Sequence, residues 1–138
     1  MIEKMHKTII NPIALAKPAG YAHGIVTHGG RLLFLAGQTG MDQTGSIATP
    51  NGIVAQFTQA LNNIKTVIEA AGGEMTDIVK LNLFVTDKAV YQANLKPIGA
   101  SYRSFFGRYY PARTLVEVKS LFDNEALIEI EGIAVLKD

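Results

Sequence analysis

The amino-acid sequence predicts an α+β sandwich, in which two helices pack on one face of a mixed sheet. Apolar residues recur at helical spacing in one long and one shorter segment, and several apolar runs have the length of strands. The chain has 138 residues, and its 13 glycines and 5 prolines are spread along it without a linker or a repeat. We therefore expect one domain over residues 1–138.

The N-terminal part of the chain contains three apolar runs that predict strands. These runs are Lys7–Ile10, Ala22–Thr27 and Leu32–Ala36. Gly29 and Gly30 lie between the second and third runs, and glycine supplies the positive φ that tight hairpins need. We therefore expect these two strands to form a hairpin. The glycine- and proline-containing segments Asn11–Gly20 and Gln38–Gly52 are predicted loops.

The clearest predicted helix is Ile53–Ala71. Its apolar side chains recur every three or four residues and form one stripe, and Gly72-Gly73 follows as a stop signal. Residues 87–106 also have a helical pattern, but Pro97 has no backbone N–H to continue a helix. We therefore predict a short turn near Val90–Asn94 and a second helix from Pro97 to Phe106.

The C-terminal half adds three more predicted strands, of which the last is apolar on both faces. They are Ile78–Val85, Thr114–Lys119 and Leu127–Leu136. A strand with two apolar faces is usually buried on both sides, whereas two helices cover only one face of a sheet. We therefore expect other subunits to cover the second face. The alternative is that a few apolar residues face solvent, as is common for single residues.

Composition excludes several classes of function. The chain has no cysteine, and His6, His23 and His28 do not have the spacing of metal ligands, so we expect no metal site. A net charge of +1 argues against a nucleic-acid partner. The longest apolar run, Leu32–Ala36, is far shorter than the roughly 20 residues of a membrane helix, and the N-terminus lacks a signal-peptide core. We expect a soluble, cytoplasmic protein.

The residues best suited to chemistry lie near the C-terminus. Arg113 precedes a predicted strand, where a guanidinium can hold a carboxylate by two parallel hydrogen bonds. Glu117, Glu129 and Glu131 lie on the last two strands, and a carboxylate among apolar neighbours is costly unless it is paired or hydrated. Arg113 could hold a substrate while a glutamate positions water or moves a proton. The alternative is a structural ion pair between Arg113 and one glutamate.

Two positions in the N-terminal third also suit a binding site. Gly37 follows a predicted strand, where the absence of a side chain allows a ligand to approach the backbone N–H. Tyr21 lies in a predicted loop, where its phenol can donate a hydrogen bond. The alternatives are an ordinary turn glycine and a half-buried loop aromatic.

Motifs in order from Pro18 to Val135 resemble the YjgF/RidA family, the reactive-intermediate imine/enamine deaminases also called the L-PSP endoribonuclease family. The most specific are Pro-Ala-Arg at residues 111–113 and Ile-Glu-Ile-Glu-Gly-Ile-Ala at residues 128–134. The others are Ala-Gly-Tyr-Ala-His-Gly at 19–24, Leu-Ala-Gly-Gln at 35–38, Leu-Asn-Asn-Ile at 61–64, Asp-Ile-Val-Lys at 77–80 and Phe-Val-Thr-Asp at 84–87.

This resemblance implies a chorismate-mutase-like fold that assembles as a homotrimer. The three sheets would face inward, and the active sites would lie in clefts between subunits. It also implies a hydrolase that acts on C–N bonds and converts 2-enamines or 2-imines, such as 2-aminoacrylate, to 2-keto acids and ammonia. No metal or organic cofactor is implied.

The resemblance also implies roles for individual residues. Arg113 matches the arginine that binds the substrate carboxylate, and Glu129 matches the residue that holds the attacking water. Tyr21 matches a tyrosine that lines the pocket, and Gly37 matches the glycine whose backbone N–H helps to hold the carboxylate. Leu115 stands in the pocket where many members have a cysteine.

Other departures from the family pattern concern the substrate rather than the arginine. Ala36 replaces a frequent serine, Gly99 replaces a frequent asparagine, and the Asp87–Phe106 segment carries an insertion that includes Pro97. One alternative is therefore a deaminase of a larger amino-substituted unsaturated acid in a catabolic pathway. Others are a non-catalytic module that binds a small metabolite, or a ribonuclease or RNA-binding protein. The presence of both Arg113 and Glu129 favours catalysis.

Overall fold

A computed structural model describes residues 4–47, 50 and 52–138. Three residues of the predicted loop Gln38–Gly52, at positions 48, 49 and 51, and the first three residues of the N-terminal segment lie outside this description. The elements, in order, are β1 (His6–Ile10), β2 (Gly24–His28), β3 (Arg31–Gln38), α1 (Ile53–Ala70), the short 3-10 helix η1 (Met75–Asp77), β4 (Ile78–Val85), α2 (Lys88–Ala93), α3 (Leu95–Phe106), β5 (Ala112–Glu117) and β6 (Ile128–Leu136).

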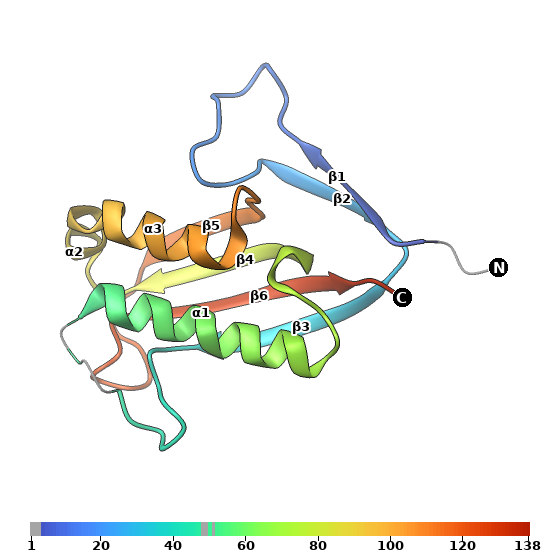
Figure 1. The fold of residues 1–138 in the computed structure, drawn as a ribbon. Coiled ribbons are helices and arrows are strands. Elements are labelled where there is room, and N and C mark those ends of the chain that lie inside the picture. The colour runs from blue at the N-terminus through green and yellow to red at the C-terminus, as the bar shows by residue number, and fades with distance from the viewer. Residues whose placement is uncertain (1–3, 48–49, 51) are drawn as a thin grey trace.

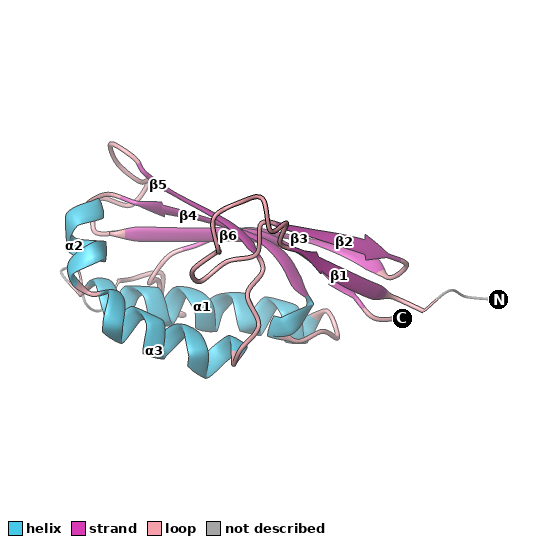
Figure 2. Ribbon diagram, turned by 90° about the horizontal axis from the view of Figure 1, so that it is seen from above, coloured by secondary structure: helices cyan, strands magenta, loops and turns pink. Residues whose placement is uncertain are grey.

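The main sheet confirms the predicted α+β class. Its strand order is β3-β6-β4-β5, with β4 and β5 parallel and the other pairs antiparallel, so the sheet is mixed. Helices α1 and α3 lie side by side on one face of this sheet (Figure 1). Seen from above, the helices form one layer, and no helix among the described residues lies on the opposite side of the strands (Figure 2). We call that uncovered side the outer face.

Helix α1 forms where the apolar stripe predicts it. Its stripe is buried against the sheet, and Phe57, Leu61, Ile64 and Ile68 are each at most 1% exposed. The helix ends at Ala70, and Gly72 adopts a φ of +86°, which a residue with a side chain rarely adopts. The predicted end at Ala71 is therefore confirmed to within one residue.

The second helical segment is interrupted, as predicted, but its second helix begins two residues before the predicted start at Pro97. α2 ends at Ala93, Asn94 separates the two helices, and α3 begins at Leu95. Pro97 is therefore the third residue of α3. Backbone N–H groups in the first turn have no partner within the helix, so proline is tolerated there.

The predicted hairpin between the second and third strands is wrong. β2 pairs with β1 in an antiparallel two-stranded sheet, and β3 pairs with β6. Gly29 and Gly30 have φ values of +74° and +80°, as the prediction requires, but they carry the chain from one sheet into the other. β3 joins β6 because its alternate side chains, such as Leu35 at 4% exposure, need the main core.

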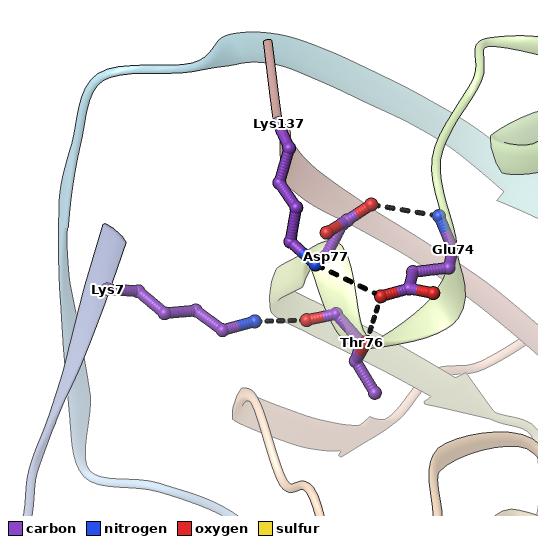
Figure 3. A network of polar contacts seen from close by, with 5 residues as sticks. All are labelled: Lys7, Glu74, Thr76, Asp77 and Lys137. Atoms are coloured by element: carbon purple, nitrogen blue, oxygen red, sulfur yellow. Dashed lines mark hydrogen bonds and ion pairs between the residues drawn. The ribbon is translucent and has the colours of Figure 1, made fainter. Parts of the chain in front are cut away.

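A polar network fastens the β1–β2 hairpin to the main body (Figure 3). The Lys7 ammonium on β1 donates to the Thr76 carbonyl and lies 4.0 Å from the centre of the Tyr109 ring. Asp77, which is 3% exposed, accepts a 2.8 Å hydrogen bond from the Glu74 N–H. Glu74 also pairs with Lys137 beyond β6 at 3.2 Å. These contacts hold β1 and β2 against the main body, and they thereby determine where the loop between the two strands lies.

Two strand boundaries differ from prediction in ways that matter for the site. β5 begins at Ala112 rather than Thr114, so Arg113 belongs to the strand and alternates with its neighbours. The predicted strand Ala22–Thr27 becomes Gly24–His28, and Ala22 forms an isolated parallel bridge with Ala112. The loop before β2 is thereby held alongside the start of β5.

The outer face carries exposed apolar side chains. Leu32 and Phe34 on β3 are 64% and 70% exposed, and they pair with Val135 and Ile133 on β6. The helix side of β6 is buried, as predicted, with Ile128, Ile130 and Ala134 fully enclosed. No helix among the described residues is both long and apolar enough to cross a membrane.

Candidate functional site

Arg113 lies on the helix face of the sheet. It pairs in register with Leu81 of β4, which is 1% exposed and belongs to the core, so both side chains point toward the helices. The guanidinium acts electrostatically on the hydroxyls of Tyr91 and Tyr102. Arg113 therefore stands at the edge of the core, with two phenols beside it.

A cleft of about 200 Å³ surrounds the Arg113 side chain. Its walls come from α2, α3, the start of β5 and the loop before β2. The residues lining it are Ala19, Gly20, Tyr91, Leu95, Ile98, Gly99, Tyr102, Arg103, Tyr110 and Arg113. None of these is acidic, so the positive charge in the cleft has no carboxylate to balance it. Such a cleft suits a small anion.

Stacked aromatic rings make one wall of the cleft rigid. Tyr102 stacks against Phe106 with ring centres 4.4 Å apart and against Tyr110 at 5.2 Å. The Tyr102 hydroxyl donates a 2.6 Å hydrogen bond to the Tyr109 carbonyl, which ties α3 to the segment that leads into β5. The packed rings therefore hold the backbone that leads to Arg113 in one position.

Tyr91 and Tyr102 remain protonated at neutral pH. Burial raises the pKa of Tyr91 and of Tyr102, and in both residues the nearby Arg113 charge opposes this rise without cancelling it. A protonated phenol can donate a hydrogen bond to an anion. The Tyr102 hydroxyl already donates to the Tyr109 carbonyl, so the neutral donor beside the cation is Tyr91.

The loop before β2 closes the cleft from above. The Ala22 N–H donates a 3.0 Å hydrogen bond to the Pro111 carbonyl, which places Gly20 over the guanidinium. Gly20 has a φ of +78°, and a Cβ atom there would lie 3.4 Å from Arg113 Nη2. Glycine is required here by the backbone conformation.

Tyr21 lies in an adjoining groove rather than among the residues that line the Arg113 cleft. The groove has a volume of about 840 Å³ and runs beneath the loop of residues 11–23. Gly20 and Tyr110 line both spaces, so the groove continues from the cleft. The Tyr21 ring meets His23 edge-on at 5.3 Å. The structure therefore places Tyr21 in the groove next to the Arg113 cleft.

Glu129 and Gly37 meet on the outer face. A Cβ atom built on Gly37 would lie 2.3 Å from Glu129 Oε1 and 2.7 Å from its carboxyl carbon. The carboxylate thus occupies the space that a side chain at position 37 would fill. Glu129 pairs in register with Phe84 of β4, which alternates with the buried Leu83 and Val85, so it points away from the helices. Gly37 is exposed beside it.

The end of β3 is positioned by the first helix. The Asn63 amide on α1 donates to the carbonyls of Thr39 and Met41 at 3.1 and 2.9 Å. Gly40 packs so closely on α1 that a Cβ atom there would lie 2.9 Å from Gln56 Cα. The pairing of β3 with β6 is also irregular between Leu35 and Gln38. Gly37 therefore lies in a bulge whose far end is anchored to the core.

The structure brings the predicted site residues together in two groups on opposite faces of one sheet. Arg113, with Tyr91 and Tyr102, lies on the helix face, and Glu129, with Gly37, lies on the outer face. Among the described residues, Arg113 has no ion pair with Glu117, Glu129 or Glu131. The alternative of a structural ion pair is therefore not supported.

The other predicted residues have more limited contacts. The Glu117 carboxylate accepts a 2.7 Å hydrogen bond from the Lys88 N–H at the start of α2, which is a structural role. Leu115 follows Arg113 on the same face and packs, half-buried, against the core. Glu131 lies on the outer face in register with Asn82.

Sequence reasoning missed Tyr91, Tyr102 and Arg103 as cleft residues. Tyr102 and Arg103 belong to a helix that the sequence predicts, but only the packing of α3 shows that both line the space around Arg113. The one available signal was Gly99, a glycine inside a helix one turn before Arg103. Within the described part of the chain, no group of three histidines or carboxylates could hold a metal ion.

Comparisons with known proteins show the family to which the chain belongs. The family model described as Endoribonuclease L-PSP matches residues 12–136. The chain is 36% identical over 135 residues to the 2-iminobutanoate/2-iminopropanoate deaminase of Escherichia coli K12, covering 95% of this chain and 98% of that protein. It is 38% identical over 120 residues to a RutC family protein of Pyrococcus horikoshii, covering 86% and 89%.

Solved structures of Rid and YjgF proteins have the same fold as this chain. A protein of the conserved Rid family from Yersinia pestis superposes with a TM-score of 0.84 at 33% identity, over 94% of this chain and 98% of that one. The YjgF protein of Escherichia coli superposes with a TM-score of 0.64 at 37% identity, over 83% and 87%. The predicted resemblance is confirmed, and the chain belongs to the L-PSP endoribonuclease family, which is the RidA/YjgF family.

Proposed function

We propose that this protein is a deaminase that hydrolyses 2-imino and 2-enamine acids to 2-keto acids and ammonia. The observation that carries this proposal is the Arg113 cleft, a positively charged space with the Tyr91 phenol beside the guanidinium and no carboxylate lining it. The curated name of the Escherichia coli relative, 2-iminobutanoate/2-iminopropanoate deaminase, supports the same reaction.

The proposed reaction needs little from the protein beyond orientation and water. Arg113 holds the substrate carboxylate by charge-assisted hydrogen bonds. An imine protonated on nitrogen is already electrophilic at its carbon, so no protein nucleophile is required. Glu129 holds a water molecule and accepts its proton as the oxygen attacks that carbon. Glu129 then returns this proton to the nitrogen of the resulting carbinolamine, and the C–N bond breaks as the hydroxyl oxygen forms the C=O bond. Ammonia leaves, the hydroxyl proton passes to Glu129, and the 2-keto acid is released.

We propose further that each active site is formed by two copies of the chain in a homotrimer. Arg113 and Glu129 point to opposite sides of the sheet, so one chain cannot present both to the same small substrate. Leu32 and Phe34 expose apolar side chains on the outer face, and burial of these side chains against another subunit would be favourable. The Arg113 cleft of one subunit would then meet the Gly37–Glu129 pair of the next. A cytoplasmic location and independence from cofactors belong to the same proposal.

The proposed activity is tested by a coupled assay. A threonine or serine dehydratase generates the short-lived enamine and imine in solution, and release of the keto acid is followed with and without this protein. We expect the protein to accelerate release. Replacing Arg113→Ala should lower kcat/KM by about 100- to 1000-fold, because the substrate carboxylate loses its charged partner.

The matched control is Arg31→Ala, which removes an exposed arginine at the start of β3, outside the residues that line the cleft. This variant should accelerate release as the unchanged protein does. Equal activity of the Arg113→Ala and Arg31→Ala variants would contradict the proposed role of Arg113. No acceleration by the folded, unchanged protein would contradict the deaminase proposal itself.

A further inference from the structure

Arg103 places a second cation in the cleft that contains Arg113. Both side chains line the same space of about 200 Å³, and the described residues lining it include no acidic side chain. Arg103 forms no ion pair with any described carboxylate. Arg103 is exposed to solvent at the mouth of this cleft, where its positive charge adds to that of Arg113 and favours an anion that reaches both.

Gly99 makes the space in which the Arg103 guanidinium lies. The two residues are one helical turn apart on α3, and helical side chains lean toward the N-terminus, so residue 103 lies over residue 99. A Cβ atom on Gly99 would approach Arg103 Nη1 to 3.2 Å, which is closer than such atoms usually pack.

The glycine is not required by the backbone of the helix. Gly99 is absent from the described glycines with positive φ, and a glycine inside a helix costs about 1 kcal/mol relative to alanine. The lost helix stability is explained if the absence of a side chain at Gly99 allows the Arg103 guanidinium to reach the cleft. The other structural role for an arginine in the last turn, an interaction with the C-terminal carbonyls, does not fit, because this guanidinium lies one turn back.

We infer that this deaminase prefers 2-imino or 2-enamine acids that carry a second carboxylate. The inference rests on the proposed function and names its substrate class. Arg113 holds the carboxylate next to the reacting carbon, and Arg103 holds the one at the other end. Hydrolysis proceeds as for the simpler acids: water adds to the imine carbon, the C–N bond breaks, and ammonia leaves. The size of the cleft suits a short dicarboxylic acid.

The test compares two substrates that differ in the second carboxylate. 2-Iminoglutarate and 2-iminobutanoate are each generated in solution by enzymatic oxidation of the corresponding amino acid, and keto-acid release is measured. For Arg103→Gln we expect kcat/KM for 2-iminoglutarate to fall by about 10- to 100-fold. For 2-iminobutanoate we expect a change of at most about threefold, because no group of that substrate reaches Arg103.

Three further variants separate a specific contact from a general loss of charge. Lys96→Gln removes a cation from α3 that does not line the cleft, and it should leave both substrates unaffected. Arg103→Lys should recover part of the activity on 2-iminoglutarate. Gly99→Ala should lower that activity while raising the denaturation midpoint, because the helix gains an alanine as the guanidinium is displaced.

A binding measurement separates failure of this inference from failure of the proposed function. Calorimetry with the keto acids 2-oxoglutarate and 2-oxobutanoate should show tighter binding of the dicarboxylate, and the difference should disappear in Arg103→Gln. Equal affinities, together with equal effects of Arg103→Gln on both imines, would overturn the inference and leave the deaminase intact. A preference for 2-oxoglutarate without any deamination would overturn the proposed function and retain the dicarboxylate site.

Discussion

The two halves of the candidate site are built differently. The Arg113 cleft is supported by the core of its own chain, and Tyr91 and Tyr102 beside it are each 4% exposed. The Gly37–Glu129 pair lies on an open face of the sheet, near side chains such as Phe34 that are 70% exposed. The Arg113 cleft is enclosed by residues of its own chain, whereas the Gly37–Glu129 pair would be buried only by contact with a second chain.

This difference shows which contacts position Arg113 and which position Glu129. The direction of Arg113 is set by stacked rings and by a hydrogen bond from the Tyr102 hydroxyl, both within one subunit. The position of Glu129 is set by the missing side chain of Gly37 and by the bulge at the end of β3. We therefore expect changes in the aromatic wall of the cleft to affect folding stability, and changes at the Gly37–Glu129 pair to affect activity with little effect on stability.

Among variants that keep both Arg113 and Glu129, the largest effect should come from the outer face. In Gly37→Ala, the new methyl group would overlap the Glu129 carboxylate, which must move away from the water it holds in the proposed reaction. A displacement of about 1 Å can cost roughly 100-fold in rate, so we expect a loss of that order in kcat/KM. Urea denaturation should show little change, because the carboxylate can rotate toward solvent. Retention of full activity would show that the working position of Glu129 does not depend on the missing side chain at Gly37.

A smaller effect on stability should come from the cleft. Tyr102→Phe leaves the Tyr109 carbonyl without its hydrogen-bond donor in a partly buried position. We expect the free energy of unfolding to fall by about 1–2 kcal/mol, as measured by chemical denaturation. If this variant were as stable as the unchanged protein, the rigidity of the cleft would need another source.

The smallest effect should appear at alkaline pH. Burial raises the pKa of Tyr109 to about 12, while an unfolded tyrosine titrates near 10. Between these values the unfolded chain releases its proton first, so this contribution to stability is complete below about pH 10 and is lost as the pH rises toward 12. Burial of the adjacent Lys7 lowers its pKa and acts in the opposite direction.

The contribution of Tyr109 can be isolated by comparing the unchanged protein with Tyr109→Phe from pH 9 to 12. The stability of the unchanged protein should fall more steeply with pH than that of the variant. Parallel curves would show that the Tyr109 hydroxyl is not enclosed as described.

Sequence reasoning found most of the fold because the apolar patterns are local. The stripe of α1 and the apolar run of β4 determine those elements, and their boundaries agree with prediction to within one residue. Strand partners are not local. The turn at Gly29-Gly30 has the conformation of a hairpin turn, yet the partner of β3 is β6, about one hundred residues later in the chain.

The site was only partly predictable for the same reason. Arg113 and Glu129 could be identified from their motifs, but their placement on opposite faces depends on where β5 begins. A start at Ala112 puts Arg113 in the strand and turns it toward the helices. The cleft partners Tyr91, Tyr102 and Arg103 come from helices whose packing no short motif encodes.

The most direct test of the two-chain site is complementation between inactive variants. Arg113→Ala and Glu129→Ala are first assayed alone, and each should be inactive. The two chains are then co-expressed and purified together as mixed trimers. If Arg113 and Glu129 act from neighbouring subunits, random assembly produces intact sites in about a quarter of positions, and activity should return to that fraction. Mixed trimers without activity would contradict the account, because they would show that each chain must supply both residues to its own site.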